Sequence, residues 1–355
     1  MELQKFFDDN KDNLINKLKE YNLIYHKYSN LGLIIIKTKK DFKYDYDMNP
    51  WLQYCRGVII DSDKNHIVNL PPSNSIKIEL DHLDQYENLK YENLIEGTMI
   101  NMFYHNNEWM ISTRSNIGCN NKWDKCKFNE MFYEISKDKL DYNELNKDHC
   151  YTFVLQHKKN KIISPIYENR IVLVNEINMK TFENIELSNL SNIDNTDRLS
   201  FDFLKNYNEN LYYTIKGFTI KDGNKRYKWI NPNYEYVLKL KPNHNKKILN
   251  YVDLRQNGNL KEYLKFFPED RYEFNKYSKI YYELTKIIYD QYISFFVKKE
   301  IEKKDIKYSL KPILYEIHSY YKKTGIKINM KLIKEYLHNM EGKRILFIIN
   351  YFKFD

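Results

Sequence analysis

The sequence predicts an α+β protein in which an antiparallel, strand-rich first part is followed by an all-α C-terminal part. Short β-branched or aromatic segments bounded by Asn, Asp, Gly or Lys fill the chain up to about residue 245. From about Asn250 onward, apolar residues instead recur every three or four positions, which is the period of a helix. A length of 355 residues favours two domains, which we place at residues 1–248 and 249–355.

The first domain is expected to be built from hairpins of short strands. His105-Asn106-Asn107 and Asp222-Gly223-Asn224 are expected to be turns that join antiparallel strands. The expected strands are Leu33–Ile36, Gly57–Ile60, Met99–Tyr104, Trp109–Thr113, Tyr151–Gln156, Arg170–Val174 and Phe218–Ile220.

Helical periodicity marks both ends of the chain. Residues 3–20 predict one amphipathic helix, and residues 122–132 predict another. In the C-terminal part, apolar and aromatic stripes run over residues 277–292 and 310–321. We expect these stripes to form the core of the second domain, and only secondarily to offer rings on which nucleic-acid bases could stack.

Composition favours a soluble intracellular protein with a polyanionic partner. Lys and Arg outnumber Asp and Glu by 57 to 48, which gives a net charge of +9. The four cysteines form no CxxC pair, so neither a zinc site nor a disulfide framework is indicated. Residues 1–14 do not resemble a signal peptide, and no apolar run is long enough to span a membrane. We therefore expect a cytoplasmic location.

Four elements in the first third of the chain resemble motifs of phage-type RNA ligases. Residues 54–61, Tyr-Cys-Arg-Gly-Val-Ile-Ile-Asp, resemble the CRG element of that family, and Lys77 follows about twenty residues later. Residues 94–98, Leu-Ile-Glu-Gly-Thr, resemble nucleotidyltransferase motif I, with Glu96, Gly97 and Thr98 matching. Residues 112–117, which include Arg114, resemble the basic strand end that follows motif I.

Three later segments resemble the remaining ligase motifs, in family order. Residues 153–163 resemble motif III, residues 215–220 resemble motif IV, and Arg226-Tyr227-Lys228 resembles motif V, with residues 239–241 as a second candidate. The resemblance covers roughly residues 50–245. It implies an antiparallel nucleotidyltransferase core of the ATP-grasp-like ligase type, followed by a helical domain that in such ligases confers substrate specificity.

The catalytic positions of these motifs are changed. Leu94 occupies the place of the nucleophilic lysine, and leucine has no lone pair with which to attack an α-phosphate. Val154 and Lys216 replace the glutamates that the resemblance implies for ribose contact and for holding Mg²⁺ or Mn²⁺. We therefore expect no catalytic residue and no metal site, and a metal only if the protein is active after all.

The residues that remain favour binding of an anion. By resemblance, the candidate nucleotide- or RNA-binding residues lie around the phosphates or the RNA end. They are Arg56, Lys77, Glu96, Gly97, Arg114, Lys216, Arg226 and Lys228. For Glu96, a solvated turn carboxylate is an equally good interpretation. His157, followed by lysines, is best interpreted as the basic tip of a hairpin loop.

The leading hypothesis is a catalytically degenerate RNA ligase-like protein that binds a nucleotide such as ATP or GTP, an RNA 5′ end or a cap in a cationic pocket. An active ATP-dependent RNA ligase or capping-type enzyme that uses a displaced lysine, such as Lys90 or Lys77, is the first alternative. A viral scaffold or complex subunit that uses only the fold, with a protein partner on the helical domain, is the second. The Lys- and Asn-rich style resembles proteins of large cytoplasmic DNA viruses, which implies a viral factory or a virion as the place of action.

Overall fold

The computed structural model describes residues 1–87, 89–123, 126–205, 211–244 and 246–352. Two compact units divide between Glu235 and Tyr236, inside helix α5 (Pro232–Leu240). The sequence placed the domain boundary after residue 248, because the long run of helical periodicity begins only there. The assignment of separate roles to the two domains stays a prediction. None of the helices in these ranges is long and apolar enough to cross a membrane.

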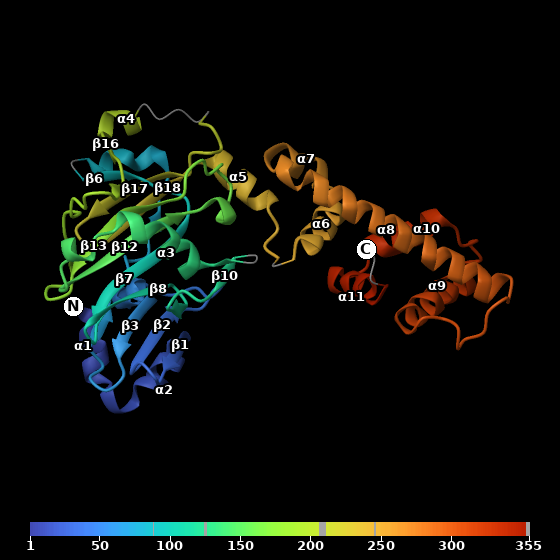
Figure 1. Ribbon diagram of the computed structural model, residues 1–355, viewed down its shortest axis with the longest axis horizontal. Coiled ribbons are helices and arrows are strands. Elements are labelled where there is room, and N and C mark those ends of the chain that lie inside the picture. The colour runs from blue at the N-terminus through green and yellow to red at the C-terminus, as the bar shows by residue number, and fades with distance from the viewer. Residues whose placement is uncertain (88, 124–125, 206–210, 245, 353–355) are drawn as a thin grey trace. The chain divides into compact units, whose positions relative to one another are not determined.

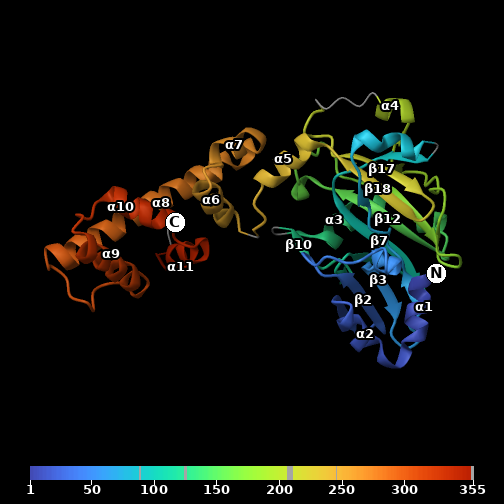
Figure 2. The same ribbon diagram turned by 180° about the vertical axis from the view of Figure 1, so that it is seen from behind.

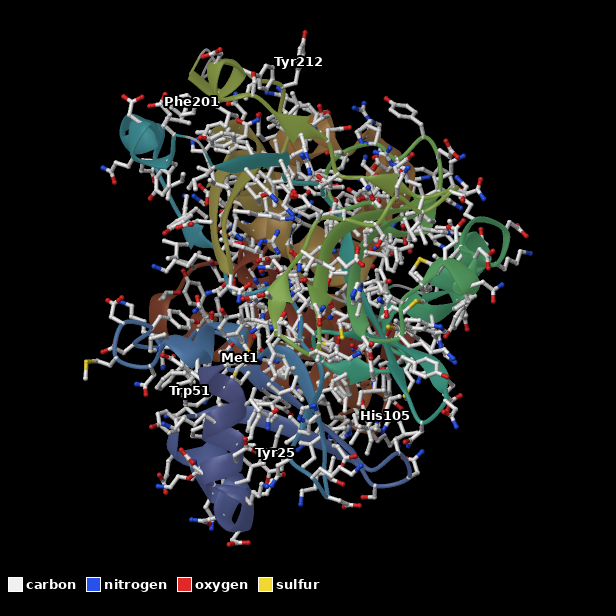
Figure 3. The ribbon with its side chains drawn as sticks, turned by 90° about the vertical axis from the view of Figure 1, so that its left-hand side faces the viewer. Met1, Tyr25, Trp51, His105, Phe201 and Tyr212 are labelled. Carbon is white, nitrogen blue, oxygen red and sulfur yellow. The ribbon has the colours of Figure 1, made fainter. Side chains whose placement is uncertain are left out.

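The chain begins with two short helices that pack on an antiparallel sheet. Helices α1 (Glu2–Asp9) and α2 (Leu14–Glu20) replace the single predicted helix, because the backbone leaves helical geometry at Asn10. The sheet contains, in order, β1 (Leu23–Tyr28), β2 (Leu33–Thr38), β3 (Arg56–Asp61) and β4 (Ile67–Asn69). Trp51 lies beside the N-terminal helices (Figure 3), where its ring stacks on Phe6 with centroids 4.0 Å apart.

A second sheet forms the centre of the first unit (Figure 1). Its strands follow the order β14-β13-β12-β7-β8-β9, and β15 pairs with β13 in parallel. Their bounds are β7 (Thr98–His105), β8 (Glu108–Thr113), β9 (Asn116–Ile117), β12 (His149–Gln156), β13 (Arg170–Asn178), β14 (Glu183–Asn184) and β15 (Asp194–Asn195).

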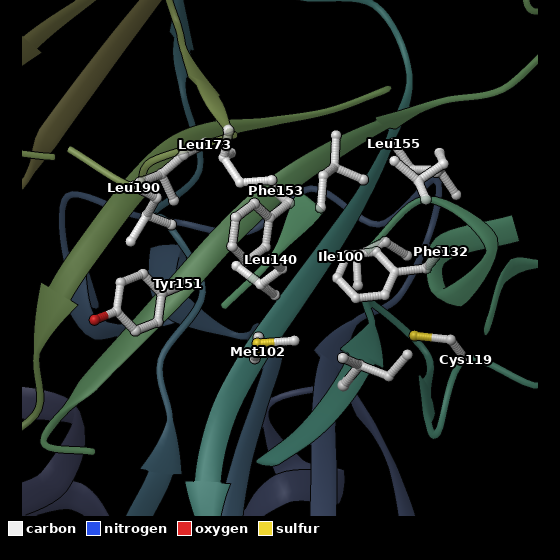
Figure 4. Packing of buried hydrophobic residues seen from close by; sticks show 14 of the residues in the cluster. Ile100, Met102, Cys119, Phe132, Leu140, Tyr151, Phe153, Leu155, Leu173 and Leu190 are labelled. Atoms are coloured by element: carbon white, nitrogen blue, oxygen red, sulfur yellow. The ribbon is translucent and has the colours of Figure 1, made fainter. Parts of the chain in front are cut away.

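Helix α3 (Phe128–Lys139) covers one face of this central sheet. Tyr151, Phe153 and Leu155 alternate along β12 and belong to the same buried cluster as Phe132 of the helix (Figure 4), whose ring centroid lies 6.0 Å from that of Phe153. Because side chains alternate along a strand, the intervening Thr152 and Val154 face the other side. The predicted helix over residues 122–132 is wrong in its first half: β10 (Lys122–Trp123) and β11 (Cys126–Lys127) form a small hairpin, and the helix begins at Phe128.

A third sheet, visible from behind in Figure 2, contains strands from distant parts of the chain in the order β16-β6-β17-β18-β5. Hydrophobic residues such as Phe218, Ile220 and Trp229 pack on one face and leave the opposite face polar. The bounds are β5 (Ile76–Lys77), β6 (Lys90–Asn93), β16 (Arg198–Leu199), β17 (Gly217–Asp222) and β18 (Lys225–Ile230). Helix α4 (Phe201–Lys205) follows β16.

The second unit is helical, as predicted. The long helix α8 (Arg271–Tyr292) buries Ile280, Leu284 and Ile288, and it continues into a π-helical turn, η7 (Ile293–Val297). The other helices are α6 (Lys247–Gln256), α7 (Leu260–Phe266), α9 (Lys311–Thr324), α10 (Met330–His338) and α11 (Gly342–Phe352).

Short 3₁₀ helices join the longer elements in both units. They are η1 (Lys11–Asn13), η2 (Pro50–Tyr54), η3 (Leu80–Tyr86), η4 (Tyr142–Glu144), η5 (Lys158–Asn160), η6 (Pro268–Asp270) and η8 (Tyr308–Leu310). The predicted α+β class, with antiparallel sheets followed by a helical C-terminal region, is confirmed.

Candidate functional site

Arg56 begins β3, where the chain passes very close to the turn after β8. Gly57 has a φ of +102°, and a Cβ added to it would lie 2.8 Å from the Cα of Arg114. Only glycine permits this approach, which brings the two arginines into the same region. Burial, and then the charges of Arg114 and Arg226, lower the pKa of the Arg56 guanidinium to about 10. The Arg114 guanidinium also donates to the Thr38 carbonyl oxygen at 3.0 Å.

Arg226 and Lys228 project from β18 on the polar face of the third sheet. They pair in register with Lys221 and Thr219 of β17, so the side chains of these four residues share that face. Arg226 is only 7% exposed, and its Nε has no hydrogen-bond partner in the described part of the chain. Burial, followed by the charges of Arg56, Arg226 and Lys77, lowers the pKa of Lys228.

Lys216 directly precedes β17, and its amine reaches the segment that resembles motif I. The Nζ atom donates to the Ile95 carbonyl oxygen at 3.5 Å. Burial lowers the pKa of Lys216; the negative charge of Glu96 opposes this shift, while Lys228 and Arg56 add to it. Lys216 is therefore a desolvated amine beside residues 94–96.

We call Arg56, Lys216, Arg226 and Lys228 the cation cluster. No carboxylate among the described residues lies within ion-pair distance of any of the four. Burial is the main cause that lowers the pKa of each of the four, and the charges of other members of the cluster lower the pKa values of Arg56, Lys216 and Lys228 further. Holding buried like charges together costs folding free energy unless an anion compensates them.

Glu96 is buried, and this contradicts its interpretation as a solvated turn carboxylate. The side chain is 6% exposed. Its Oε1 accepts hydrogen bonds from the backbone N–H groups of Ile163 and Ser164, both at 3.0 Å. The Tyr234 hydroxyl also contacts Glu96, and burial together with this carboxylate raises the pKa of Tyr234. Glu96 thus ties the loop after β12 to the loop before β7.

Gly97 is required by packing. Its φ is +151°, and an added Cβ would lie 2.4 Å from the Leu155 carbonyl oxygen and 2.6 Å from Val154 Cγ1. This close approach lets the motif I-like loop lie directly on β12. Gly97 is thus adjacent to Val154, the position at which the resemblance expects a glutamate.

The lysines considered as displaced nucleophiles lie at the surface and pair with acids. Lys77 is exposed, with its Nζ 3.4 Å from Glu235, although it remains close enough to influence Lys228. Lys90 forms an ion pair with Glu186. Neither amine is buried, so neither shares the environment of Lys216.

The residues present do not fit a divalent metal. Val154 packs with Val172 and Val174 and offers no oxygen ligand. Glu96 is engaged by backbone N–H groups, and Glu92 forms a buried ion pair with Lys221 at 2.8 Å. In the described ranges, no group of three or more His, Cys, Asp or Glu residues is placed to hold a metal ion.

Sequence reasoning missed two basic residues near the cluster and misplaced a histidine. Lys37 donates to Ser115 Oγ at 2.9 Å, and burial and Arg114 lower its pKa. Lys221 also donates to the Val174 carbonyl oxygen at 2.9 Å, which links the third sheet to the central sheet. His157 is 1% exposed and accepts from the Lys159 N–H, so it is a buried cap and not an exposed loop tip. A lone lysine in a strand carries no motif, so nothing local marked Lys37 or Lys221.

A cavity of about 300 Å³ lies along the same polar face, at the β17–β18 turn. Lys90, Glu92, Arg198 and Lys221 line it together with residues 184–187. Lys221, which lines the cavity, pairs in register with Arg226 of the cation cluster.

No family model matches the chain, and no curated protein matches it. Among solved structures, the chain is similar to a candidate ATP-dependent DNA ligase from Aquifex aeolicus, at 15% identity over 88% of this chain and 80% of that one, with a TM-score of 0.43. It is also similar to an archaeal ATP-dependent RNA ligase, at 12% identity over 67% and 64% of the two chains and a TM-score of 0.46.

A third similar structure is a mutant RNA ligase from Naegleria gruberi with ATP and Mn, at 10% identity over 59% of this chain and 91% of that one, with a TM-score of 0.32. The solved structures that resemble this chain thus include ATP-dependent DNA and RNA ligases. At these identities and TM-scores, the function has to be argued from the residues of the site.

Proposed function

We propose that the first unit binds a phosphate-rich ligand, a nucleotide or an RNA 5′ end, at the cation cluster and does not form a covalent adenylate. The observation that carries the proposal is the set of four desolvated cations without a carboxylate at ion-pair distance among the described residues. Guanidinium and ammonium groups of this kind form charge-assisted hydrogen bonds with phosphate oxygens.

The charge balance of the site supports an anionic ligand that arrives without a metal. Val154 and Lys216 stand where the ligase resemblance expects acids, so the pocket carries more positive charge and fewer hard oxygen ligands. A triphosphate or an RNA phosphate would offset the mutual repulsion of the cations. Neutralising each ligand phosphate also releases counterions, so the affinity is expected to fall as salt rises.

Binding of ATP, GTP, inorganic pyrophosphate, and 5′-phosphorylated or 5′-hydroxyl RNA, measured by calorimetry at two salt concentrations, tests this proposal. Arg56→Gln and Lys228→Gln are expected to weaken binding by about tenfold or more, as for the loss of a hydrogen bond to a charged group. Lys27→Gln is the matched control, because Lys27 is an exposed lysine of β1. Equal affinity of all three variants, or binding that is insensitive to salt, would refute the proposal.

One observation favours a second candidate function, a nucleotidyltransferase that uses Lys216 as the amine. Its pKa is lowered by burial and by neighbouring cations, which is the environment that activates lysine nucleophiles. Its Nζ also lies against the backbone of residues 94–96. The surface ion pairs of Lys77 and Lys90 disfavour those two lysines for the same role. Labelling with an α-labelled nucleotide separates this candidate from non-covalent binding.

A scaffold role that uses only the fold predicts a different outcome. The cation cluster would then have no ligand, and neither the protein nor its variants would bind nucleotide measurably. Copurification of a stoichiometric protein partner without nucleic acid would favour that role.

A further inference from the structure

The positive charge of this protein is concentrated in its helical unit. Residues 236–355 contain 25 Lys and Arg against 14 Asp and Glu, a net charge of +11, whereas residues 1–235 contain 32 against 34. The first unit, which holds the cation cluster, therefore contributes none of the net positive charge of the chain. A polyanionic partner has to be sought on the second unit as well.

Part of this charge surrounds a set of aromatic rings that are not core residues. Between Lys298 and Lys327 the chain has nine lysines and four acids. Two of the acids, Glu300 and Glu302, pair with Lys298 and Lys304, and Glu316 pairs with Arg344. Lys322 and Lys323 are exposed at the end of α9, with no acid at ion-pair distance in the described part of the chain.

These rings come from the π-helical turn η7 and from helix α9, and they pack against one another. Helix α9 lies beside the end of α8 (Figures 1 and 2). Phe296 stacks on His318 with centroids 3.8 Å apart and an interplanar angle of 11°. Tyr321 continues the stack at 5.9 Å from His318, and Tyr315 meets Phe296 edge-on at 5.6 Å. Tyr315 and Tyr321 are 41% and 42% exposed, so they still present ring surface to solvent.

Charge and ring lie together in this region. The Lys303 Nζ stands 5.7 Å from the centroid of the Tyr315 ring, and Lys322 is close enough to His318 to lower its pKa, after the larger effect of burial. We call Phe296, Tyr315, His318, Tyr321, Lys303 and Lys322 the basic aromatic surface. A π-helical turn, as at η7, is frequent at functional sites because it sets side chains out of the regular helical order.

We propose that the basic aromatic surface binds a single-stranded polynucleotide, with unpaired bases stacking on Tyr315 and Tyr321 and backbone phosphates contacting Lys303 and Lys322. Exposed rings interleaved with lysines are the combination that holds single strands without sequence preference, because every base has a π-face and every residue of the strand has a phosphate. A duplex hides its base faces, so it can use only the lysines. This inference rests on the second unit alone and does not depend on the cation cluster.

The test is fluorescence anisotropy of the full chain with a labelled single-stranded RNA of mixed sequence, about 20 nucleotides long so that it exceeds the site size of such surfaces, and with the same RNA as a duplex. The single strand is expected to bind at least tenfold more tightly than the duplex. The double variant Tyr315→Leu/Tyr321→Leu is expected to weaken single-strand binding by roughly tenfold or more, because two stacking platforms are removed. Tyr272→Leu is the control, since Tyr272 is 86% exposed at the start of α8 and outside the stack.

A second variant tests the electrostatic part without touching the core. In Lys303→Gln/Lys322→Gln, the slope of log affinity against log salt is expected to become shallower by about 0.7 for each phosphate that the protein no longer neutralises. ATP binding by these tyrosine and lysine variants of the second unit is measured in parallel and is expected to stay unchanged. If the tyrosine and the lysine variants bind the single strand as tightly as the unmodified chain, or if the duplex binds equally well, the proposal is overturned. ATP binding by the Arg56 and Lys228 variants tests the cation cluster and does not test the basic aromatic surface.

Discussion

The backbone of Arg114 fills the space beside Gly57: a Cβ added to Gly57 would lie only 2.8 Å from the Cα of Arg114. This contact joins the start of β3 to the turn after β8 and sets Arg56 beside Arg114. Burial, and then the charges of Arg114 and Arg226, lower the pKa of Arg56. Glycine at position 57 therefore allows β3 to lie close to the turn after β8, and this close approach helps to assemble the charged site.

Gly57→Ala is expected to destabilise the protein by about 2 kcal/mol, because the new Cβ meets backbone and the φ of +102° is strained for any L side chain. It should also weaken nucleotide binding, since Arg114 has to move away from Arg56. Chemical unfolding and calorimetry measure the two effects. Gly223→Asn is the control, because Gly223 has a φ of +55° and nothing within 4 Å of an added Cβ. Equal effects of the two substitutions would contradict the packing role of Gly57.

Glu96→Ala is expected to cost about 2–4 kcal/mol, because the N–H groups of Ile163 and Ser164 would be left without an acceptor in a buried place. Glu96→Gln keeps one acceptor oxygen and should cost less. The midpoint of urea unfolding gives both values. A change below about 0.5 kcal/mol for the alanine variant would mean that Glu96 is a surface carboxylate after all.

Lys216→Met is expected to raise stability and to weaken binding. The pKa of Lys216 is lowered in the folded protein, so the charged amine costs folding free energy below that lowered pKa, and this cost fades as pH rises through it. Removing the charge should therefore raise the free energy of unfolding at pH 7 by about 1 kcal/mol. Nucleotide affinity should fall in the same variant. Reduced stability with unchanged affinity would contradict this account.

Nucleotide binding is expected to take up protons at alkaline pH. A bound phosphate raises the lowered pKa values of Lys216 and Lys228, so between their free and bound pKa values the complex holds more protons than the free protein. Affinity should therefore fall as pH rises from neutrality toward the ordinary lysine pKa of 10.5. Calorimetry in two buffers of different ionisation enthalpy measures the uptake. An affinity that is constant over this range in the unmodified protein, with no buffer dependence, would argue against desolvated lysines at the phosphate.

Periodicity and local motifs were sufficient to predict part of this protein. Strands such as Gly57–Ile60 and Tyr151–Gln156 alternate or carry β-branched residues, and the structure places strands there. Arg56, Arg226 and Lys228 were selected as candidates because each lies in a short motif, and their role in binding stays a prediction. The break at Asn10 and the start of α3 at Phe128 were not found, since helix ends depend on one or two residues.

Long-range partners explain the rest of what was missed. The burial of Glu96 depends on the backbone of Ile163 and Ser164, far along the chain, and local sequence holds no sign of that contact. The aromatic stripes of the helical unit were expected to be core; Tyr281 and Tyr292 are buried, but Tyr321 is 42% exposed. Helical spacing gives the face on which a ring lies, but not whether another element covers that face.

The central claim is that the cation cluster holds a nucleotide without forming a bond to it. The direct measurement is incubation of the full chain with α-labelled ATP or GTP and Mn²⁺, followed by denaturation in detergent at neutral pH and denaturing electrophoresis. We predict saturable nucleotide binding before denaturation and no label on the denatured chain. A stoichiometric label that survives denaturation, is stable in base but lost in acid as a lysyl phosphoramidate is, and disappears in Lys216→Met would contradict the claim and identify an active nucleotidyltransferase.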